Sequence, residues 1–190
     1  LTIAEKTRLF VSGNLEVRYW GIVKNYGESE IIGDLLLRND DTPGYADTKF
    51  YNYNQTSVFG DIICGTNSYI FMENKHSVLS VKGDINLVSN RYGKVSSGTT
   101  ILLGDEKQSI TNYDCPTFII ENESEEGVVF ETKISPSVLF NHNGNKFTLK
   151  SGGTFIDYDG DGLKDDVDPM PTVGNPCTLY FKSEDAEKGP

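Results

Sequence analysis

The sequence predicts an all-β fold, in the form of an irregular right-handed β-solenoid of the parallel β-helix type. Helix-forming composition is confined to residues 2–9, and the rest of the 190-residue chain mixes Thr, Val, Ile, Tyr and Phe with Gly, Asn, Asp and Ser. That mixture is typical of short strands joined by tight turns. A Gly-Asn or Gly-Asp pair followed by an apolar residue also recurs four times in the first half. The recurrence predicts that the strands repeat as coils.

Eleven short runs of strand-forming residues follow one another along the chain. Each contains apolar, β-branched or aromatic residues and is bounded by turn residues. Such runs are compatible with a barrel, a sandwich or a solenoid. They lie at 15–19, 31–37, 57–64, 69–72, 78–81, 85–88, 99–103, 118–121, 128–132, 138–140 and 146–149.

The repeated dipeptide favours the solenoid. Its spacings of 20, 27 and 23 residues fall in the range of one solenoid coil. We predict five to seven coils that turn at this dipeptide, where glycine adopts a left-handed backbone at little cost. The longest spacing contains residues 39–44, which we expect to form an inserted surface loop. A β-sandwich is the alternative. The four copies are Gly13-Asn14-Leu15, Gly33-Asp34-Leu35, Gly60-Asp61-Ile62 and Gly83-Asp84-Ile85.

An acidic segment near the C-terminus matches a twelve-residue calcium loop. Calcium prefers six to eight hard oxygen ligands, and Gly162 permits the sharp turn that makes such ligands converge. Strand-like residues precede the loop and Pro169 follows it, so the loop lacks the helices of an EF-hand. We expect a structural calcium ion; the alternative is a solvated acidic turn without an ion. The predicted ligands are the side chains of Asp157, Asp159, Asp161, Asp165 and Asp168 and the carbonyl oxygen of Leu163.

These features divide the chain into three parts. Residues 1–152 are predicted to form the β-repeat solenoid. Residues 153–172 are predicted to form a calcium-binding cap, because the last coil of a solenoid needs cover for its unpaired backbone groups. Residues 173–190 are predicted to be an exit segment or linker.

Two resemblances extend this interpretation. Residues 157–169 resemble a single acidic repeat of the thrombospondin type 3 kind, which occurs in many secreted bacterial proteins. Residues 99–168 look like a β-repeat module of very large secreted or cell-surface proteins of Firmicutes. The second resemblance implies a stalk or presentation scaffold, and its motifs contain no catalytic residue. They are ILLGDEKQSI at 101–110, FIIEN at 118–122, GVVF at 127–130 and LFNHNGNKFTL at 139–149.

The composition argues against several classes of partner and site. A formal net charge of −11 repels phosphate backbones, so we expect no nucleic-acid partner. No apolar run approaches the roughly 18 residues of a membrane span, so we expect no membrane insertion. Three cysteines are too few for a disulfide framework, and we expect buried thiols. His76 and His142 lie far apart without partners at zinc-ligand spacing.

The sequence therefore predicts a non-catalytic structural or adhesive module of a secreted or cell-surface bacterial protein, stabilised by one calcium ion. Candidate partners besides calcium are a glycan or a host or cell-surface protein. A carbohydrate-binding module is the alternative, and a fragment of a polysaccharide lyase or hydrolase is a weaker one. The aromatic residues considered for a sugar platform are expected in the core instead. They are Tyr45, Phe50, Tyr51, Tyr53 and Phe59, and separately Tyr19 with Trp20.

Overall fold

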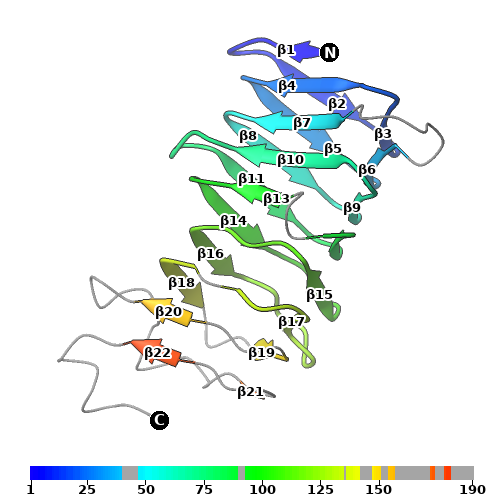
Figure 1. Ribbon diagram of the computed structural model, residues 1–190. Helices are drawn as coiled ribbons and strands as arrows, with labels where there is room; N and C mark the ends of the chain where they lie inside the picture. Colours follow the sequence, from blue (N-terminus) through cyan, green and yellow to red (C-terminus); the bar gives the residue numbers. More distant parts are fainter. Residues whose placement is uncertain are drawn as a thin grey trace.

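The protein is a β-solenoid in which three parallel sheets run along one axis (Figure 1). The computed structural model describes residues 1–39, 47–89, 93–134, 136–141, 147–150, 154–156, 172–173 and 178–180. These residues make about six turns. The predicted solenoid is confirmed, and the strand pairings are parallel rather than those of an antiparallel sandwich.

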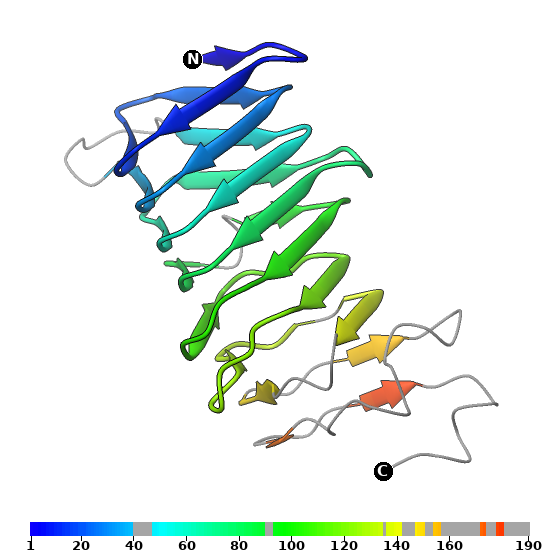
Figure 2. The same cartoon turned by 180° about the vertical axis from the view of Figure 1, so that it is seen from behind.

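Each full coil contributes one strand to each of sheets A, B and C, and Figures 1 and 2 show sheets A and B on opposite sides of the stack. Sheet A contains β1 (Thr2–Ile3), β4 (Ile22–Asn25), β7 (Thr48–Asn52), β10 (Ser68–Met72) and β13 (Gly93–Val95). Sheet B contains β2 (Arg8–Val11), β5 (Glu28–Ile31), β8 (Gln55–Val58), β11 (Val78–Val81), β14 (Thr99–Leu102), β16 (Thr117–Ile120) and β18 (Val138–Asn141). Sheet C contains β3 (Leu15–Arg18), β6 (Leu35–Arg38), β9 (Ile62–Cys64), β12 (Ile85–Leu87), β15 (Gln108–Thr111), β17 (Val128–Phe130), β19 (Phe147–Leu149) and β21 (Thr172–Val173). A separate pair joins β20 (Thr154–Ile156) to β22 (Thr178–Tyr180).

Alternate side chains of each strand fill the interior in stacked columns. In sheet C, Leu35, Ile62, Ile85 and Ile110 are register partners from coil to coil, and all four are fully buried. Burying one such side chain contributes roughly 1.5–3 kcal/mol. Because the side-chain period of a strand is two, this column fixes the register of every coil it crosses.

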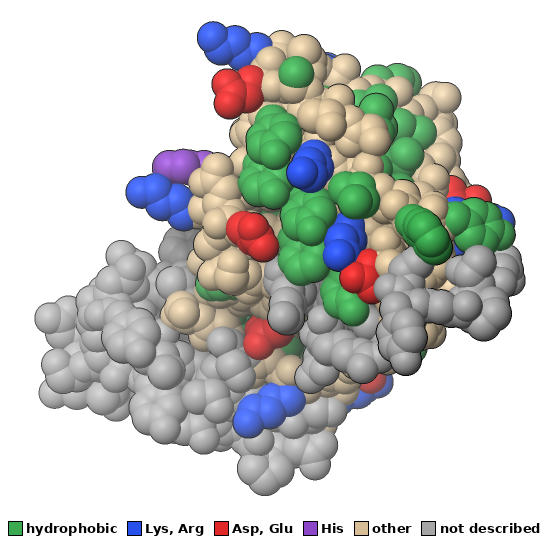
Figure 3. Space-filling model, turned by 45° about the horizontal axis from the view of Figure 1, so that its top comes forward, with side chains coloured by type: hydrophobic (Ala, Val, Ile, Leu, Met, Phe, Trp, Pro, Cys, Tyr) green, Lys and Arg blue, Asp and Glu red, His purple; other side chains and the backbone are tan. Residues whose placement is uncertain are grey.

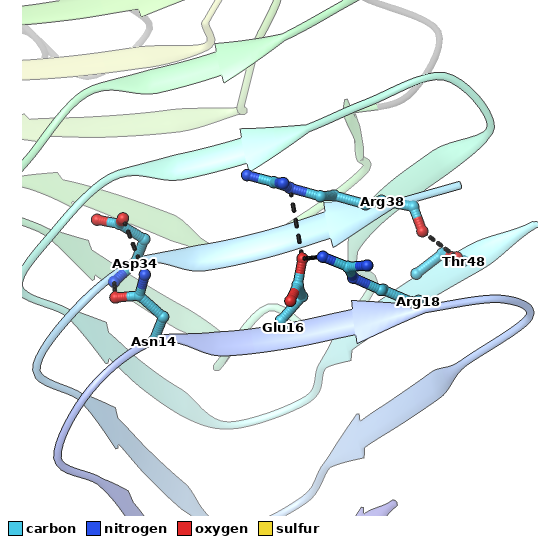
Figure 4. A network of polar contacts seen from close by, with 6 residues as sticks. All are labelled: Asn14, Glu16, Arg18, Asp34, Arg38 and Thr48. Carbon is cyan, nitrogen blue, oxygen red and sulfur yellow. Dashed lines mark hydrogen bonds and ion pairs between the residues drawn. The ribbon is translucent and has the colours of Figure 1, made fainter. Parts of the chain in front are cut away.

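The repeated Gly-Asx dipeptide forms one corner of the solenoid, between sheets B and C. The Asx side chain of each coil accepts a hydrogen bond from the backbone N–H of the residue at the same corner of the next coil, as Figure 4 shows for Asn14 and Asp34. We call this series the corner ladder. Its bonds run from the Asp34 N–H to Asn14 Oδ1 (2.9 Å), from the Asp61 N–H to Asp34 Oδ1 (2.9 Å), from the Asp84 N–H to Asp61 Oδ1 (2.8 Å) and from the Ser109 N–H to Asp84 Oδ1 (2.7 Å).

The corner is where predicted, but the reason for its glycines is different. Among the glycines of the described chain, those with positive φ are Gly98, Gly104 and Gly127, and none of these is a glycine of the repeated dipeptide. The predicted left-handed backbone at the corner is therefore wrong. Glycine is needed there because successive corners approach closely. A Cβ on Gly83 would lie 2.6 Å from both the carbonyl carbon and the carbonyl oxygen of Gly60.

A second polar ladder lies inside the solenoid, at the corner between sheets A and B. Asn25 and Asn52 are register partners and fully buried, and Asn25 Nδ2 donates to Asn52 Oδ1 at 3.2 Å. Asn52 Nδ2 in turn donates to the carbonyl oxygen of Val78 at 2.8 Å, and Thr56 Oγ1 donates to Asn52 Oδ1 at 2.9 Å. These bonds satisfy polar groups that would otherwise be costly to bury, and they connect one coil to the next.

The sixth coil has an irregular segment where earlier coils have a strand of sheet A. After β15, residues 112–116 lead directly to β16. Tyr113 and Cys115 of this segment are buried, and the Tyr113 hydroxyl is 2.7 Å from Thr100 Oγ1. The Tyr113 ring meets Phe118 edge-on, with centroids 6.1 Å apart. Aromatic side chains therefore fill the interior of this coil.

Two sequence expectations differ in detail from the fold, and a third falls largely outside the described residues. The runs 31–37 and 57–64 each contain the end of one strand, a corner and the start of another. Residues 2–9, with helix-forming composition, contain β1 and the first part of β2, because pairing with the second coil outweighs a weak local preference. Residues 40–46, which include most of the predicted loop, lie outside the described chain.

Candidate functional site

The outer face of sheet A carries the most distinctive group of side chains in the described chain. Figure 3 shows hydrophobic side chains gathered on one face, with Lys or Arg and Asp or Glu side chains between them. Five rings of β7, β10 and the corners beside sheet A stack on one another. We call these rings the aromatic face. They belong to Tyr26, Tyr51, Tyr53, Tyr69 and Phe71.

The position of these rings follows from the register of sheet A. In β7, Phe50 and Asn52 are buried, so Tyr51 between them and Tyr53 after them lie on the outer side. The expectation that Tyr51 and Tyr53 belong to the core is therefore wrong. The same expectation is confirmed for Phe50, which is fully buried.

The rings stack mainly along the solenoid axis. Tyr51 and Phe71 are register partners whose centroids lie 4.7 Å apart with planes inclined by 13°. Tyr26 and Tyr53 stack in the same way, at 4.6 Å and 2°. These separations match the spacing of neighbouring strands, roughly 4.8 Å, so each ring turns a face toward the next coil and an edge toward solvent.

Two lysines lie over rings of the aromatic face. Lys24 is the register partner of Tyr51 on the preceding coil, and its Nζ lies 5.9 Å from the centroid of the Tyr51 ring. Lys49 Nζ lies at the same distance from the ring of Tyr69. Tyr51 is thus covered by an ammonium group on one side and by Phe71 on the other. A sugar ring binds the flat face of an aromatic side chain, so this arrangement supports coil-to-coil cohesion better than it supports a sugar platform.

Replacing Tyr51 by alanine should therefore destabilise the protein. The change removes two stacked ring pairs, with Phe71 and Tyr53, and the cation–π contact with Lys24, worth together roughly 1.5–4 kcal/mol beyond lost burial. Thermal or urea unfolding of Tyr51→Ala measures the loss, and Trp20→Ala is the matched control because the Trp20 side chain is 69% exposed. Equal stability of the two variants would contradict a cohesive role for the aromatic face.

The corner between β3 and β4 exposes two further aromatic side chains. Tyr19 is 50% exposed and Trp20 is 69% exposed. Both have positive φ, 47° and 66°, which is a costly backbone conformation for bulky side chains. Phe59, the remaining described candidate for a sugar platform, is exposed at a different corner, after β8, and Tyr45 lies outside the described residues.

An ionic network lies on the outer side of sheet C. Glu16 Oε1 is 2.6 Å from a guanidinium nitrogen of Arg18 and 3.5 Å from Arg38 Nε (Figure 4). Arg18 and Arg38 are register partners in β3 and β6. Exposed ion pairs of this kind contribute roughly 0–1 kcal/mol each, so the network adds little stability.

The two described cysteines are free and buried. Burial raises the pKa of the Cys64 thiol to about 12 and that of Cys115 to about 11. The expectation of buried thiols is thus confirmed for these two, and Cys177 lies outside the described residues. At neutral pH both thiols remain protonated and shielded, which makes them poor nucleophiles.

We expect Cys64 and Cys115 to resist alkylation in the folded protein. Iodoacetamide at pH 8 should modify them at least about 100-fold more slowly than in urea, because reaction requires opening of the core. Site-resolved mass spectrometry measures both rates. Fast native labelling of Cys64 would show that sheet C opens readily at β9.

The predicted calcium ligands Asp157, Asp159, Asp161, Leu163, Asp165 and Asp168 all lie outside the described residues. Among the residues that are described, no group of three or more His, Cys, Asp or Glu is placed to hold a metal ion. His76 is exposed, and His142 lies outside the described chain.

No helix in the described part of the chain is long and apolar enough to cross a membrane. No family model, curated protein or solved structure matches this sequence.

Proposed function

We propose that this chain is a non-catalytic structural module, a stiff β-solenoid that holds or presents other parts of a secreted or cell-surface bacterial protein. The observation that carries the proposal is the in-register stacking of successive coils, reinforced by side-chain ladders at the corners and on sheet A. The resemblance of residues 99–168 to β-repeat modules of large exported Firmicutes proteins points the same way.

Stiffness follows from how each coil is joined to the next. Three strands pair along their length with the neighbouring coil, so bending the stack strains backbone hydrogen bonds on several sides at once. The corner ladder adds charge-assisted hydrogen bonds from backbone N–H groups to Asp34 and Asp61, which are typically stronger than neutral ones. Each coil interacts mainly with its neighbours, so stability accumulates along the axis as in other repeat proteins.

Pulling a single molecule tests the mechanical role. With handles attached at Thr2 and Lys150, we expect discrete unfolding steps, because neighbouring coils release together. Gradual extension at low force would contradict a load-bearing solenoid.

A panel of polysaccharides tests the non-catalytic assignment. Turnover of any member of the panel by the same preparation would contradict that assignment.

We also propose that residues 157–168 bind one structural calcium ion. The support is the spacing of the acidic residues and Gly162 in the sequence. With an affinity typical of extracellular modules, millimolar calcium should stabilise the protein by about 1 kcal/mol.

Calorimetric titration with calcium checks this, with melting followed in parallel. We expect one ion per chain, a lower melting temperature in chelator, and loss of both effects in Asp159→Ala. Magnesium should compete poorly, because it requires a smaller octahedral site. No heat of binding, together with unchanged melting in chelator, would leave the segment as a solvated acidic turn.

A carbohydrate-binding module is the second candidate, and the exposure of Trp20 favours it. An indole ring that is 69% exposed, beside Tyr19 and the 45% exposed Ile22, offers a surface for a sugar ring. A glycan array locates such binding. Loss of a hit in Trp20→Ala but not in Phe59→Ala would place the sugar at this corner, whereas no hit across the array would remove the candidate.

A further inference from the structure

The corner between β3 and β4 holds two aromatic residues in a backbone conformation that does not suit them. The Gly21 N–H donates to the carbonyl oxygen of Arg18 at 3.0 Å, which closes a four-residue turn. The two central residues of this turn, Tyr19 and Trp20, both have positive φ, as in a type I′ turn. Such turns favour glycine, asparagine or aspartate at these positions, because the Cβ of other residues lies too close to the backbone.

Other coils have asparagine at the same corner, between sheets C and A. Asn67 lies between β9 and β10 and has a φ of 53°, and Asn112, directly after β15, has a φ of 56°. Asparagine tolerates this conformation, whereas a bulky residue in it is strained. The Trp20 side chain is 69% exposed, so burial of the ring does not compensate for the strain. Strained residues that packing does not explain cluster at binding sites.

Positive charge exceeds negative charge beside this turn. Arg18 and its register partner Arg38 both lie against one carboxylate oxygen of Glu16, at 2.6 and 3.5 Å (Figure 4). The three side chains are all partly exposed, between 33% and 44%. One carboxylate cannot neutralise two guanidinium groups, and each guanidinium carries five N–H donors in a planar fork. The two arginines therefore retain positive charge and N–H donors for an anionic ligand.

The net charge of −11 does not arise from this part of the molecule. Residues 1–38, which form the first two coils, contain five Lys or Arg residues and five Asp or Glu residues. The excess of acidic residues thus lies entirely after Arg38. Charges on distant coils are screened over roughly 10 Å at 0.1 M salt, so a negative group that approaches the turn is governed by the nearby arginines.

We infer that this corner binds a uronic-acid residue of an acidic polysaccharide, with the sugar ring on the Trp20 indole and its carboxylate on Arg18 and Arg38. The C–H face of a sugar ring packs on a flat aromatic side chain that is open to solvent. A carboxylate forms two parallel hydrogen bonds with a guanidinium, which favours an acidic over a neutral sugar. The inference rests on the carbohydrate-binding function proposed above as the second candidate, and it names the class of sugar.

Oligogalacturonate is the probe, and its methyl ester is the matched control ligand, because the ester keeps the sugar ring and removes the charge. Trp20 is the single tryptophan of the chain, so its fluorescence reports on this corner alone. With a chelator present, which excludes bridging by calcium, oligogalacturonate should protect Trp20 from quenching by acrylamide. The ester should bind at least about tenfold more weakly, since it lacks the charge-assisted hydrogen bonds.

Three variants of the full-length chain separate the two parts of the site. Arg38→Gln should lower the affinity for oligogalacturonate about tenfold, to near that for the ester. Arg8→Gln is the matched control, because Arg8 is also an exposed arginine paired with a glutamate, and it should leave the affinity unchanged. In calorimetry, Trp20→Asn should abolish binding, and its melting temperature should equal or exceed that of the original chain because asparagine suits the turn.

The outcomes distinguish this inference from the function on which it rests. Equal affinity for the acid and the ester, or binding of neutral glycans alone, would overturn the inference and leave a carbohydrate-binding corner. Absence of binding to any glycan would overturn both. A lower melting temperature of Trp20→Asn would also overturn the inference, because Trp20 would then serve the fold. So would stronger protection of Trp20 by phosphatidylglycerol vesicles than by oligogalacturonate, because the occupant would then be a membrane surface.

Discussion

Replacing Phe118 by alanine is expected to lower the free energy of unfolding by about 3–5 kcal/mol. Phe118 is fully buried in β16, and its ring meets Phe130 edge-on with centroids 5.3 Å apart. The ring of Tyr113, in the irregular segment that replaces a strand of sheet A, also meets Phe118 edge-on, with centroids 6.1 Å apart. Phe118 thus contacts two other aromatic rings, and its removal leaves a cavity that the backbone cannot easily close.

Urea unfolding followed by far-ultraviolet circular dichroism measures the loss. Phe10→Ala is the matched control, because Phe10 also lies in sheet B but its side chain is 58% exposed. The control should change stability by less than about 0.5 kcal/mol. Similar losses for both variants would mean that Phe118 does not occupy the core as described.

Replacing Gly83 by alanine should cost about 2–3 kcal/mol, at the upper end of the usual penalty for overpacking. The new Cβ would lie 2.6 Å from the carbonyl carbon and oxygen of Gly60, and backbone atoms cannot rotate away as a side chain can. Relief requires separation of the two coils, which would stretch the bond between the Asp84 N–H and Asp61 Oδ1.

Gly13→Ala is the control for this prediction. Its Cβ meets nothing within 4 Å, and alanine restricts the unfolded chain, so the variant should equal or slightly exceed the original protein in stability. Thermal unfolding of the two variants side by side measures the difference. A loss at Gly13 as large as that at Gly83 would show that these glycines serve local backbone conformation after all.

The sequence predicted the solenoid from the Gly-Asx corners because each corner is a local signal that repeats. It did not reveal why glycine stands there, since the close approach of Gly83 to Gly60 joins residues 23 positions apart in the chain. Several strands of sheet A were also missed. In β7, the buried Thr48 and Asn52 are polar while the outer Tyr51 is aromatic, so the usual alternation of apolar and polar residues is lost.

The candidate sites also differ in whether they can be recognised from the sequence or only from the fold. The proposed calcium loop is a linear motif, so its predicted ligands can be read from residues 157–168 of the sequence without knowledge of the fold. The aromatic face depends on register, because Tyr51 stacks on Phe71 only when β7 and β10 pair as they do. The exposure of Trp20 likewise depends on the backbone at one corner.

Disulfide trapping across sheet B tests most directly whether coils stack in this register. Ser57 and Ser80 are register partners on the outer side of β8 and β11, and Ile101 of β14 is the partner of Ser80 on the next coil. Neighbouring strands lie about 4.8 Å apart, within reach of a disulfide, whereas Ser57 and Ile101 are about 9–10 Å apart. In a Cys177→Ser background, the account predicts rapid oxidation of the Ser57→Cys, Ser80→Cys pair and none of the Ser57→Cys, Ile101→Cys pair. Failure of the first pair to close, or equal closure of both, would contradict the stacked coils on which the proposed function rests.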